Sequence, residues 1–472
     1  MSHVLLCGPF NRDLSVKENF AAPPLGPHRL ASWLRKHGHL ALVYDFNIHD
    51  DFEKYLRLGG AYWDIIGFSC LQVSLPYDIR AARQAKVVCP QARIVFGGIE
   101  ATLNPQDILD CAPCDLVALG EGEELLLGLA DGKPLSQLSG YLLRQHAQPV
   151  SEARFAEWWE AVDFSALEYE KYWAQTRALE PEAPEEIVNT IRLITSSHCT
   201  KGCAFCSVTR WKAAACGAAL PTVALSPEQV YRVVCKAIEQ VPSVKSFYFC
   251  EDDFIVSRER AYKAFQLLGQ TGRQFMIQTR MDKLTEPLIE HLARHGCRHI
   301  TMGIENASEA VLKAFGKPQK LEMVSEVIHW CRRYGVTPYL LFILFGPTAT
   351  LEDLKMNEER ISRWIAEGAT VSIEPNMRCY RGSPLWDSSH DMLYECQPVR
   401  EGPAKVGRRQ AIRTPIRILP DDTEARAVSI EFNRRWPEFL AAKQESHHFK
   451  GATGKHMIEL LGELLKELED AK

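Results

Sequence analysis

The chain lacks a long apolar run, a strong charge of either sign, and any repeated or low-complexity segment. Its most apolar stretch, Tyr339 to Phe345, has the length of a strand and is far too short to span a bilayer, so we expect no membrane segment. The net charge of −5 provides no basic surface to follow a phosphate backbone, which argues against nucleic acid as a partner. The first residues, MSHVLLCGPF, have neither a basic leader nor a small-residue cleavage site. We therefore predict a first strand there and a cytoplasmic protein.

The cysteine content is the most informative feature of the composition. The chain holds 15 cysteines in 472 residues, and cytoplasmic thiols stay reduced, so a disulfide framework is not expected. Most of these cysteines should be small buried hydrophobic residues, with functional ones recognisable by their spacing. The length and the apolar content of 46% predict two or three globular domains.

The first 140 residues alternate short apolar runs with helix-like segments. Such an alternation predicts an α/β fold with a parallel sheet covered by helices on both faces, a Rossmann-like domain over residues 1–140. Ligands of these sheets bind beyond the carboxyl ends of the strands, where this chain concentrates glycine. The predicted strands are 4–6, 41–45, 65–69, 94–97 and 116–119.

A second alternating series follows an irregular linker at 141–188. Six predicted strand and helix pairs over 189–389 are typical of a partial (β/α)6 barrel, whose chemistry gathers at the carboxyl ends of the strands. Residues 390–472 are predicted to form a small, mainly helical C-terminal region that covers the barrel mouth. Its last segment carries leucines on one helical face between Met457 and Leu468, which favours docking over a cofactor site.

The sharpest motif is a group of three cysteines directly after the first strand of the second series. Cys199, Cys203 and Cys206 have C-x3-C-x2-C spacing, which lets three thiolates surround one small cluster. Iron–sulfur cubanes normally take four cysteines, so three leave one iron open, and an open position marks a catalytic metal. Zinc is the competing metal, with His198 or Cys216 as its fourth ligand, and three structural cysteines are the other alternative.

The motif resembles the cluster site of radical SAM enzymes, including the aromatic Phe205 before the third cysteine. The resemblance implies a [4Fe–4S] cluster on the three cysteines and S-adenosylmethionine (SAM) on the open iron. It further implies a flavodoxin- or ferredoxin-type electron donor, whose electron splits SAM into methionine and a 5′-deoxyadenosyl radical. The protein itself would exclude water and position the cofactors.

Three charged strand ends in the barrel resemble SAM-binding segments of that family. Glu251 suits the ammonium of SAM, Arg280 can pair with its carboxylate, and Glu305 can accept hydrogen bonds from the ribose hydroxyls. Phe205 is assigned to SAM as well. A solvated surface or structural salt bridges are the alternative reading of these charges.

The first domain resembles the cobalamin-binding domain that precedes the barrel in one branch of the family. Ordinary turn glycines are the alternative, and Glu100 departs from the histidine more common in relatives at that place. Cys111 and Cys114 are interpreted as structural. The residues assigned to cobalamin are Pro24, Gly26, Ser69, Leu71, Gln72, Gly97, Gly98, Glu100, Gly120, Glu121 and Gly122.

The resemblance implies a methyltransferase that acts on an unactivated carbon, or a phosphinate, of a small-molecule or peptide substrate. The alternatives are a cobalamin-dependent radical rearrangement or cyclisation without methyl transfer, and a cobalamin or iron–sulfur sensor. Cys379 and Tyr380, near the end of the sixth strand, are weak candidates for proton or hydrogen-atom partners, with ordinary packing as the alternative.

Overall fold

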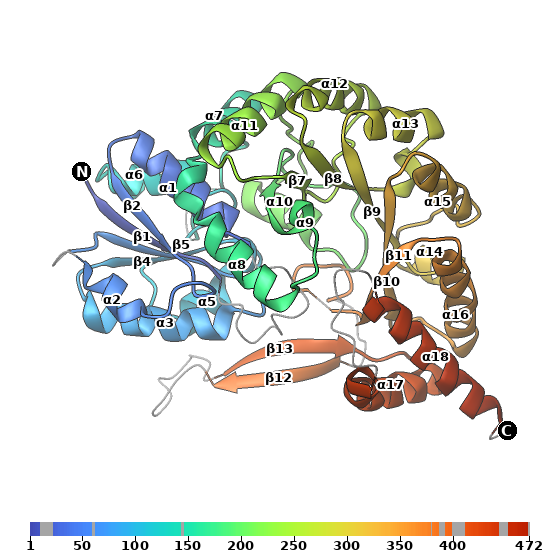
Figure 1. Ribbon diagram of the computed structural model, residues 1–472. Helices are drawn as coiled ribbons and strands as arrows, with labels where there is room; N and C mark the ends of the chain where they lie inside the picture. Colours follow the sequence, from blue (N-terminus) through green and yellow to red (C-terminus); the bar gives the residue numbers. More distant parts are fainter. Residues whose placement is uncertain are drawn as a thin grey trace.

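The computed structural model describes residues 1–9, 22–58, 62–142, 146–378, 380–386, 392–398, 411–442 and 452–470. The N-terminal domain holds a parallel five-stranded sheet in the order β2-β1-β3-β4-β5, drawn in blue on the left of Figure 1. The order reverses between β1 and β3, which places a ligand-binding crevice beyond the carboxyl ends of these two strands. The strands are β1 (His3–Cys7), β2 (Leu40–Tyr44), β3 (Ile65–Ser69), β4 (Arg93–Gly97) and β5 (Leu116–Val117).

Helices cover both faces of this sheet, because every central strand is apolar on its two sides. One face packs with α1 (Leu25–Lys36) and α6 (Glu123–Ala130), and the other packs with the remaining helices of the domain. The fold class predicted for the N-terminal residues is thereby confirmed. The remaining helices are α2 (Phe52–Leu56), α3 (Leu75–Val88), α4 (Ile99–Leu103) and α5 (Pro105–Cys111).

The segment predicted as an irregular linker is mostly helical. It contains α7 (Glu152–Ala161), α8 (Tyr169–Leu179) and α9 (Glu185–Val188). Its aromatic residues form one core with the barrel, and Trp33 of α1 joins that core. The aromatic side chains therefore hold the two domains together.

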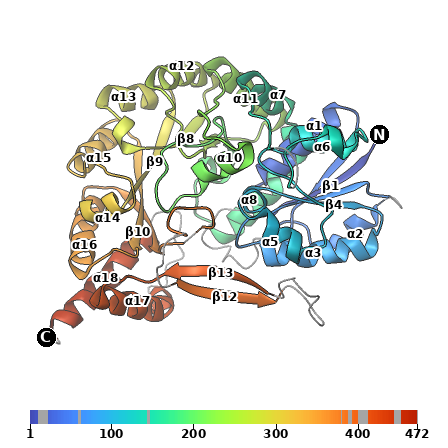
Figure 2. The same ribbon diagram turned by 180° about the vertical axis from the view of Figure 1, so that it is seen from behind.

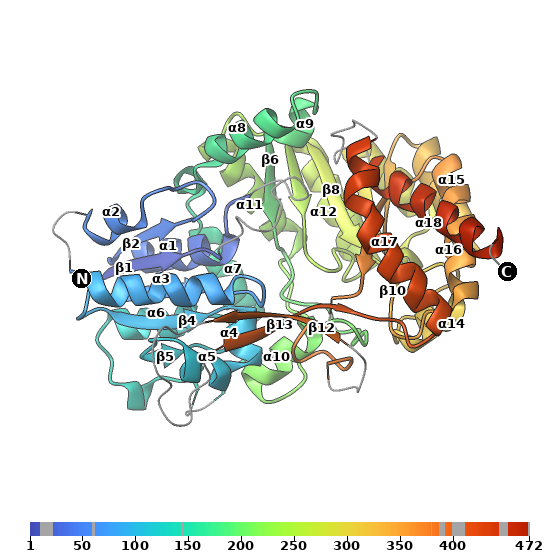
Figure 3. The same cartoon turned by 90° about the horizontal axis from the view of Figure 1, so that it is seen from below.

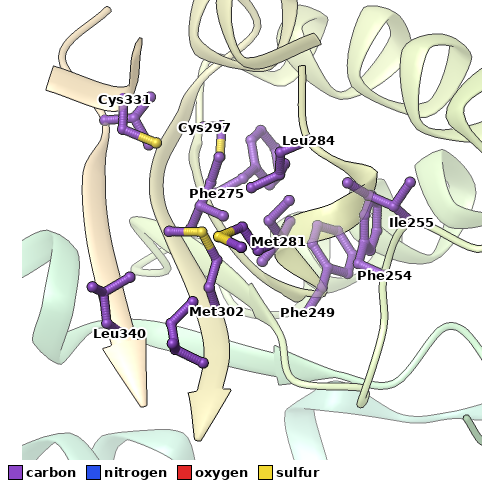
Figure 4. Packing of buried hydrophobic residues seen from close by; sticks show 14 of the residues in the cluster. Phe249, Phe254, Ile255, Phe275, Met281, Leu284, Cys297, Met302, Cys331 and Leu340 are labelled. Atoms are coloured by element: carbon purple, nitrogen blue, oxygen red, sulfur yellow. The ribbon is translucent and has the colours of Figure 1, made fainter. Parts of the chain in front are cut away.

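The second domain is a parallel six-stranded sheet in the order β11-β10-β9-β8-β7-β6, which curves into an open barrel with helices outside (Figure 1). Phe249, Phe275 and Met302 belong to the apolar layer between the strands and these helices (Figure 4). The strands are β6 (Thr190–Leu193), β7 (Ser246–Phe249), β8 (Gln274–Thr279), β9 (Cys297–Glu305), β10 (Thr337–Phe345) and β11 (Thr370–Asn376). The helices are α10 (Val208–Cys216), α11 (Pro227–Gln240), α12 (Arg258–Leu268), α13 (Glu286–Arg294), α14 (Glu309–Ala314), α15 (Met323–Arg333) and α16 (Leu351–Ala366).

The C-terminal region combines a hairpin with two helices. β12 (Met392–Pro398) and β13 (Ala411–Ile418) pair antiparallel and reach from α17 toward the N-terminal domain (Figure 3). α17 (Thr423–Ala442) and α18 (Ala452–Asp470) pack against the barrel beside α16 and β11. The apolar face of α18 is buried in the barrel core, in agreement with the predicted docking role. Among the residues described, no helix is both long and apolar enough to cross a membrane.

Candidate functional site

The three cysteines lie in a loop that its own hydrogen bonds keep curled. Cys206 donates its backbone N–H to the carbonyl of Cys203 at 3.0 Å. Thr209 donates its hydroxyl to the carbonyl of Cys199 at 3.0 Å and accepts from the backbone of Gly202 at 3.2 Å. Gly202 has a φ of +68°, a conformation that favours glycine, so the loop can reverse direction between the first two cysteines.

The cysteine side chains have the environment of ligands that need a metal to become thiolates. Burial raises the pKa of Cys206 to about 12, and the nearby Asp252 carboxylate and the other two thiols raise it as well. Burial likewise raises the pKa of Cys199. Within the described ranges, no three His, Cys, Asp or Glu side chains are grouped closely enough to hold a single metal ion. A [4Fe–4S] cubane takes each thiolate on a separate iron, so three thiols of one loop can each ligate one iron of such a cluster.

The residues considered as a fourth zinc ligand are placed differently. His198 uses both ring nitrogens in hydrogen bonds, Nδ1 with the Ser197 hydroxyl at 2.9 Å and Nε2 with the Leu220 carbonyl at 3.2 Å. Cys216 is the last residue of α10. Neither observation supports the zinc alternative.

Phe205 anchors the cysteine loop. Its ring packs edge-on against Phe315 with 5.5 Å between centroids, and the neighbouring Ala204 donates to the Phe315 carbonyl at 2.8 Å. Leu385, beyond β11, donates to the carbonyl of Ala204 at 3.0 Å. These contacts give Phe205 a packing role, and its contact with SAM stays a prediction.

The acidic end of β7 differs from the expectation in its details. Glu251 is buried, accepts hydrogen bonds from the backbone and hydroxyl of Thr195, and lies near Arg260. Burial raises the pKa of Glu251 to about 7, although these neighbours lower it. The carboxylate that reaches the cysteine loop belongs to Asp252, which is exposed and accepts a hydrogen bond from the Cys199 backbone. Both residues lie in the bend that follows β7, where Glu251 is buried and Asp252 is exposed.

Arg280 and Glu305 are each held by a neighbouring charge at the strand ends. Arg280 forms two hydrogen bonds with Asp282, at 3.1 and 3.2 Å. Burial lowers the pKa of Arg280, but Asp282 and, to a smaller extent, the neighbouring Cys203 and Cys199 raise it, so the guanidinium lies near the cysteine loop. Glu305 pairs with Lys317 at 2.5 Å.

The backbone at Glu305 has a φ of +69°, which is uncommon for a residue other than glycine. Strained positions of this kind cluster at functional sites. The strand end at Glu305 therefore has the character expected of a site residue.

A cavity of about 260 Å³ lies beyond the carboxyl ends of β1, β3, β4 and β5, at the reversal of the strand order. The barrel closes it with Ile194, Ser196, Ser197 and Trp211, which flank the cysteine motif on both sides. The residues assigned to cobalamin that line the cavity are Gly26, Ser69, Gly97, Gly98, Gly120, Glu121 and Gly122.

The glycines of this cavity fit a large ligand that approaches the backbone. Gly26 lines the cavity, and a Cβ there would meet no atom within 4 Å, so the space beside it is open. At Gly98, with a φ of +94°, a Cβ would lie 2.9 Å from the Cys70 carbonyl oxygen. Glycine at position 98 therefore allows this backbone conformation and the close approach to Cys70 at the strand ends, where cofactors of such sheets bind.

The other residues assigned to cobalamin lie outside the cavity lining. Gln72 accepts from the backbone of Arg381 at 3.0 Å, and Glu100 lies 3.7 Å from the Arg381 guanidinium, which also donates to Asp107 at 2.8 Å. These residues of the N-terminal domain contact the segment that follows β11. Leu71 is exposed and Pro24 precedes α1.

Sequence reasoning missed the polar and aromatic wall of the cavity. Arg29 forms a buried ion pair with Glu123 at 2.5 Å, and its guanidinium lies over the rings of Phe155, Trp158 and Trp159. Arg29 and Glu123 come from α1 and α6, and Trp159 from α7. The helical spacing of the aromatic residues resembles ordinary core packing, so no signal in the sequence distinguished them from core residues.

The two candidate proton partners give little further information. Cys379 lies outside the described residues. Tyr380 is 39% exposed, and burial of its hydroxyl raises its pKa, with an opposing effect from Arg378.

Comparisons with known proteins agree with this geometry. The sequence pattern of the B12 binding domain matches residues 14–130, and that of the Radical SAM superfamily matches residues 193–361. An uncharacterized methyltransferase of Pyrococcus horikoshii is 23% identical over 77% of this chain and 78% of its own length. Cytidylyl-2-hydroxyethylphosphonate methyltransferase of Streptomyces wedmorensis is 24% identical over 87% of this chain and 85% of its own length.

A solved structure has the same fold. The cobalamin-dependent SAM radical enzyme OxsB, with aqua-cobalamin and SAM bound, superimposes with a TM-score of 0.70 over 99% of this chain and 72% of its own, at 16% identity. The two matched domains bring a [4Fe–4S] cluster, SAM and cobalamin as cofactors, as the sequence predicted. The chain therefore belongs to the radical SAM enzymes that carry a B12 binding domain ahead of the barrel.

Proposed function

We propose that this enzyme methylates an unactivated carbon, or a phosphinate, of a small-molecule or peptide substrate. The observation that carries the proposal is the shared wall between the two cofactor sites. Ser196 and Ser197 lead directly into the cysteine loop, and they also line the cavity of the B12 binding domain. A methyl donor and a radical generator must act on the same substrate atom, and a common wall supports that arrangement.

When bound, the cluster supplies the electron that cleaves SAM, and the cobalamin carries the methyl group. Each turnover then consumes two molecules of SAM. One would leave as S-adenosylhomocysteine after losing its methyl group. The other would be cleaved to methionine and a 5′-deoxyadenosyl radical, which takes a hydrogen atom from the substrate and leaves as 5′-deoxyadenosine. A flavodoxin- or ferredoxin-type donor would supply two electrons per turnover, one for the cleavage of SAM and one to return the cobalamin to the state that accepts a methyl group.

The chain's own residues bind and orient these groups. Cys199, Cys203 and Cys206 hold the cluster and leave one iron for SAM. Asp252 replaces Glu251 as our assignment for the SAM ammonium, because its carboxylate reaches the cysteine loop. Arg280, which lies near the same thiols, is assigned to the SAM carboxylate.

Glu305 remains our assignment for the ribose hydroxyls. Lys317 holds its carboxylate at the strand end by an ion pair, and it also donates to the Gly303 carbonyl at 2.8 Å. Two anchors on one lysine fix the carboxylate before SAM arrives, which lowers the cost of ordering it on binding.

The test is an anaerobic incubation with SAM labelled in its methyl group, under a strong reductant. We expect S-adenosylhomocysteine and 5′-deoxyadenosine together, and label in the product once a substrate is supplied. Deoxyadenosine without S-adenosylhomocysteine, or an unlabelled product, would contradict methyl transfer and indicate rearrangement or cyclisation. Cys203→Ala serves as the matched control, because it should release neither product from the same mixture.

A further inference from the structure

Helix α10 begins two residues after the last cysteine of the motif and is anchored on the N-terminal domain. Lys212, in its middle, donates to both carboxylate oxygens of Glu121 at 2.6 and 2.7 Å. The two side chains are only 2% and 7% exposed. Figure 2 shows α10 between the barrel and the N-terminal sheet domain. The ion pair therefore joins the two domains in a place that water hardly reaches.

A buried ion pair is a poor way to gain stability. The cost of removing two charges from water can exceed their attraction, and an apolar pair of similar volume is often at least as stable. What such a pair does supply is a fixed geometry, because a displaced lysine would leave Glu121 buried and uncompensated. The surrounding contacts are equally specific. Gly120 has a φ of +73°, and a Cβ there would lie 2.9 Å from the Cβ of Ala215 on α10.

The same helix contacts both cofactor sites. Trp211 lines the cavity of the B12 binding domain, as does Glu121. In the first turn of the same helix, the Thr209 hydroxyl hydrogen-bonds with the backbones of Cys199 and Gly202 in the cysteine loop. A rigid element with direct contacts to two sites meets the physical requirement for energetic coupling between them.

We propose that cobalamin binding and cluster assembly favour each other through α10, and that Lys212 is the positioning residue that holds this helix on Glu121. Filling the cavity fixes Trp211 and Glu121, which fixes α10 and thereby orders the cysteine loop. Reciprocity requires that an assembled cluster improves cobalamin affinity by the same factor. The inference rests on the proposed function only for the identity of the molecule in the cavity.

The experiment measures cobalamin affinity in the presence and absence of the cluster. The dissociation constant of hydroxocobalamin is determined by anaerobic equilibrium dialysis for the cluster-free chain and for the chain reconstituted with iron and sulfide. We expect the reconstituted chain to bind more tightly by a factor between about 5 and about 150, the usual range of coupling between sites. Loss of iron to a chelator should slow when hydroxocobalamin is added. Equal affinities for the two forms would overturn the inference.

Variants of the ion pair then locate the coupling. The double variant Glu121→Met with Lys212→Met replaces the pair by apolar side chains of similar volume, so it should fold. Because Glu121 itself lines the cavity, cobalamin affinity is compared only within this variant, with and without the cluster, and the ratio of the two affinities should be near one. Lys212→Arg keeps two hydrogen-bond donors for the Glu121 carboxylate, so this variant should keep the coupling of the wild-type chain. Arg232→Met is the matched control. It removes an exposed ion pair, 2.6 Å long, between Arg232 of α11 and Glu160 of α7, and it should leave the coupling factor unchanged.

The outcomes separate the two proposals. If both cofactors bind the wild-type chain but independently of each other, the inference fails and the proposed function stands. A double variant with the wild-type coupling factor would overturn the role of Lys212. If hydroxocobalamin binds neither form of the wild-type chain, the proposed function falls together with the inference.

Discussion

Replacing Gly26 with leucine should separate the stability of the protein from its binding of cobalamin. Gly26 lies in the first turn of α1 and lines the cavity, and a Cβ at this position meets no atom within 4 Å. Its φ is not positive, so a larger residue adopts the same backbone without strain. Leucine is a better helix former than glycine by up to about 1 kcal/mol. The free chain should therefore be unchanged or more stable.

The effect on cofactor binding has the opposite sign. A ligand present at 100 times its dissociation constant adds about 2.7 kcal/mol to the stability of the form that binds it. Leucine at Gly26 fills the space that the cofactor needs, so Gly26→Leu should lose this stabilisation. With hydroxocobalamin present, the variant should be about 2 kcal/mol less stable than the wild-type chain, although it is no less stable alone.

Hydrogen exchange of the backbone amides of α1, with and without hydroxocobalamin, measures both effects because it reports the free energy of opening that helix. Gly26→Ala is the control, since one methyl group should preserve most of the binding. Unchanged cobalamin affinity in Gly26→Leu would refute the assignment of the cavity. Clear destabilisation of the free variant would refute the claim that the space beside Gly26 is open.

Three further predictions follow from single contacts. Burial raises the pKa of Glu100 from 4.5 to about 7, so the folded chain holds one more proton than the unfolded chain at pH values between these two. In a series of denaturation experiments from about pH 4.5 to about pH 8, the wild-type chain should therefore lose up to about 3 kcal/mol of stability relative to the Glu100→Gln variant. Asp252→Asn should weaken SAM binding about tenfold or more in equilibrium dialysis while the iron content stays unchanged, and unaltered binding would argue against the assignment. Leu461→Ala, at a fully buried position on α18, should cost about 2–5 kcal/mol in chemical denaturation, whereas a negligible cost would mean that α18 is not docked.

The strands of the N-terminal sheet could be predicted closely because their apolar runs end at clear boundaries. β3 occupies Ile65–Ser69, the predicted range, and the other four strands differ from their predicted ranges by two residues or fewer at either end. Helix starts carry equally local signals: α11 begins at Pro227 because Ser226 forms a capping box with Gln229 and proline stands at the first helical position. Signals of this kind depend on residues that are close in the sequence, so they can be recognised without knowing how distant segments pack.

The contacts between domains could not be predicted in the same way. Lys212 lies in the short helix α10, and its partner Glu121 is 91 residues away in the sequence. The choice between Glu251 and Asp252 depends on how the bend after β7 turns toward the cysteine loop. The aromatic residues of α7 and α8 gave a pattern that looked irregular because they pack against two domains at once. Such features depend on where distant segments meet.

The most direct test of the account is the cluster itself. Anaerobically reconstituted wild-type chain should hold about four irons, and the electron paramagnetic resonance spectrum of its reduced cluster should change when SAM is added. Cys203→Ala should hold no stable cluster and release no 5′-deoxyadenosine, while its hydroxocobalamin binding is at most weakened. A Cys203→Ala protein with wild-type iron content and wild-type release of 5′-deoxyadenosine would contradict the assignment of the three cysteines.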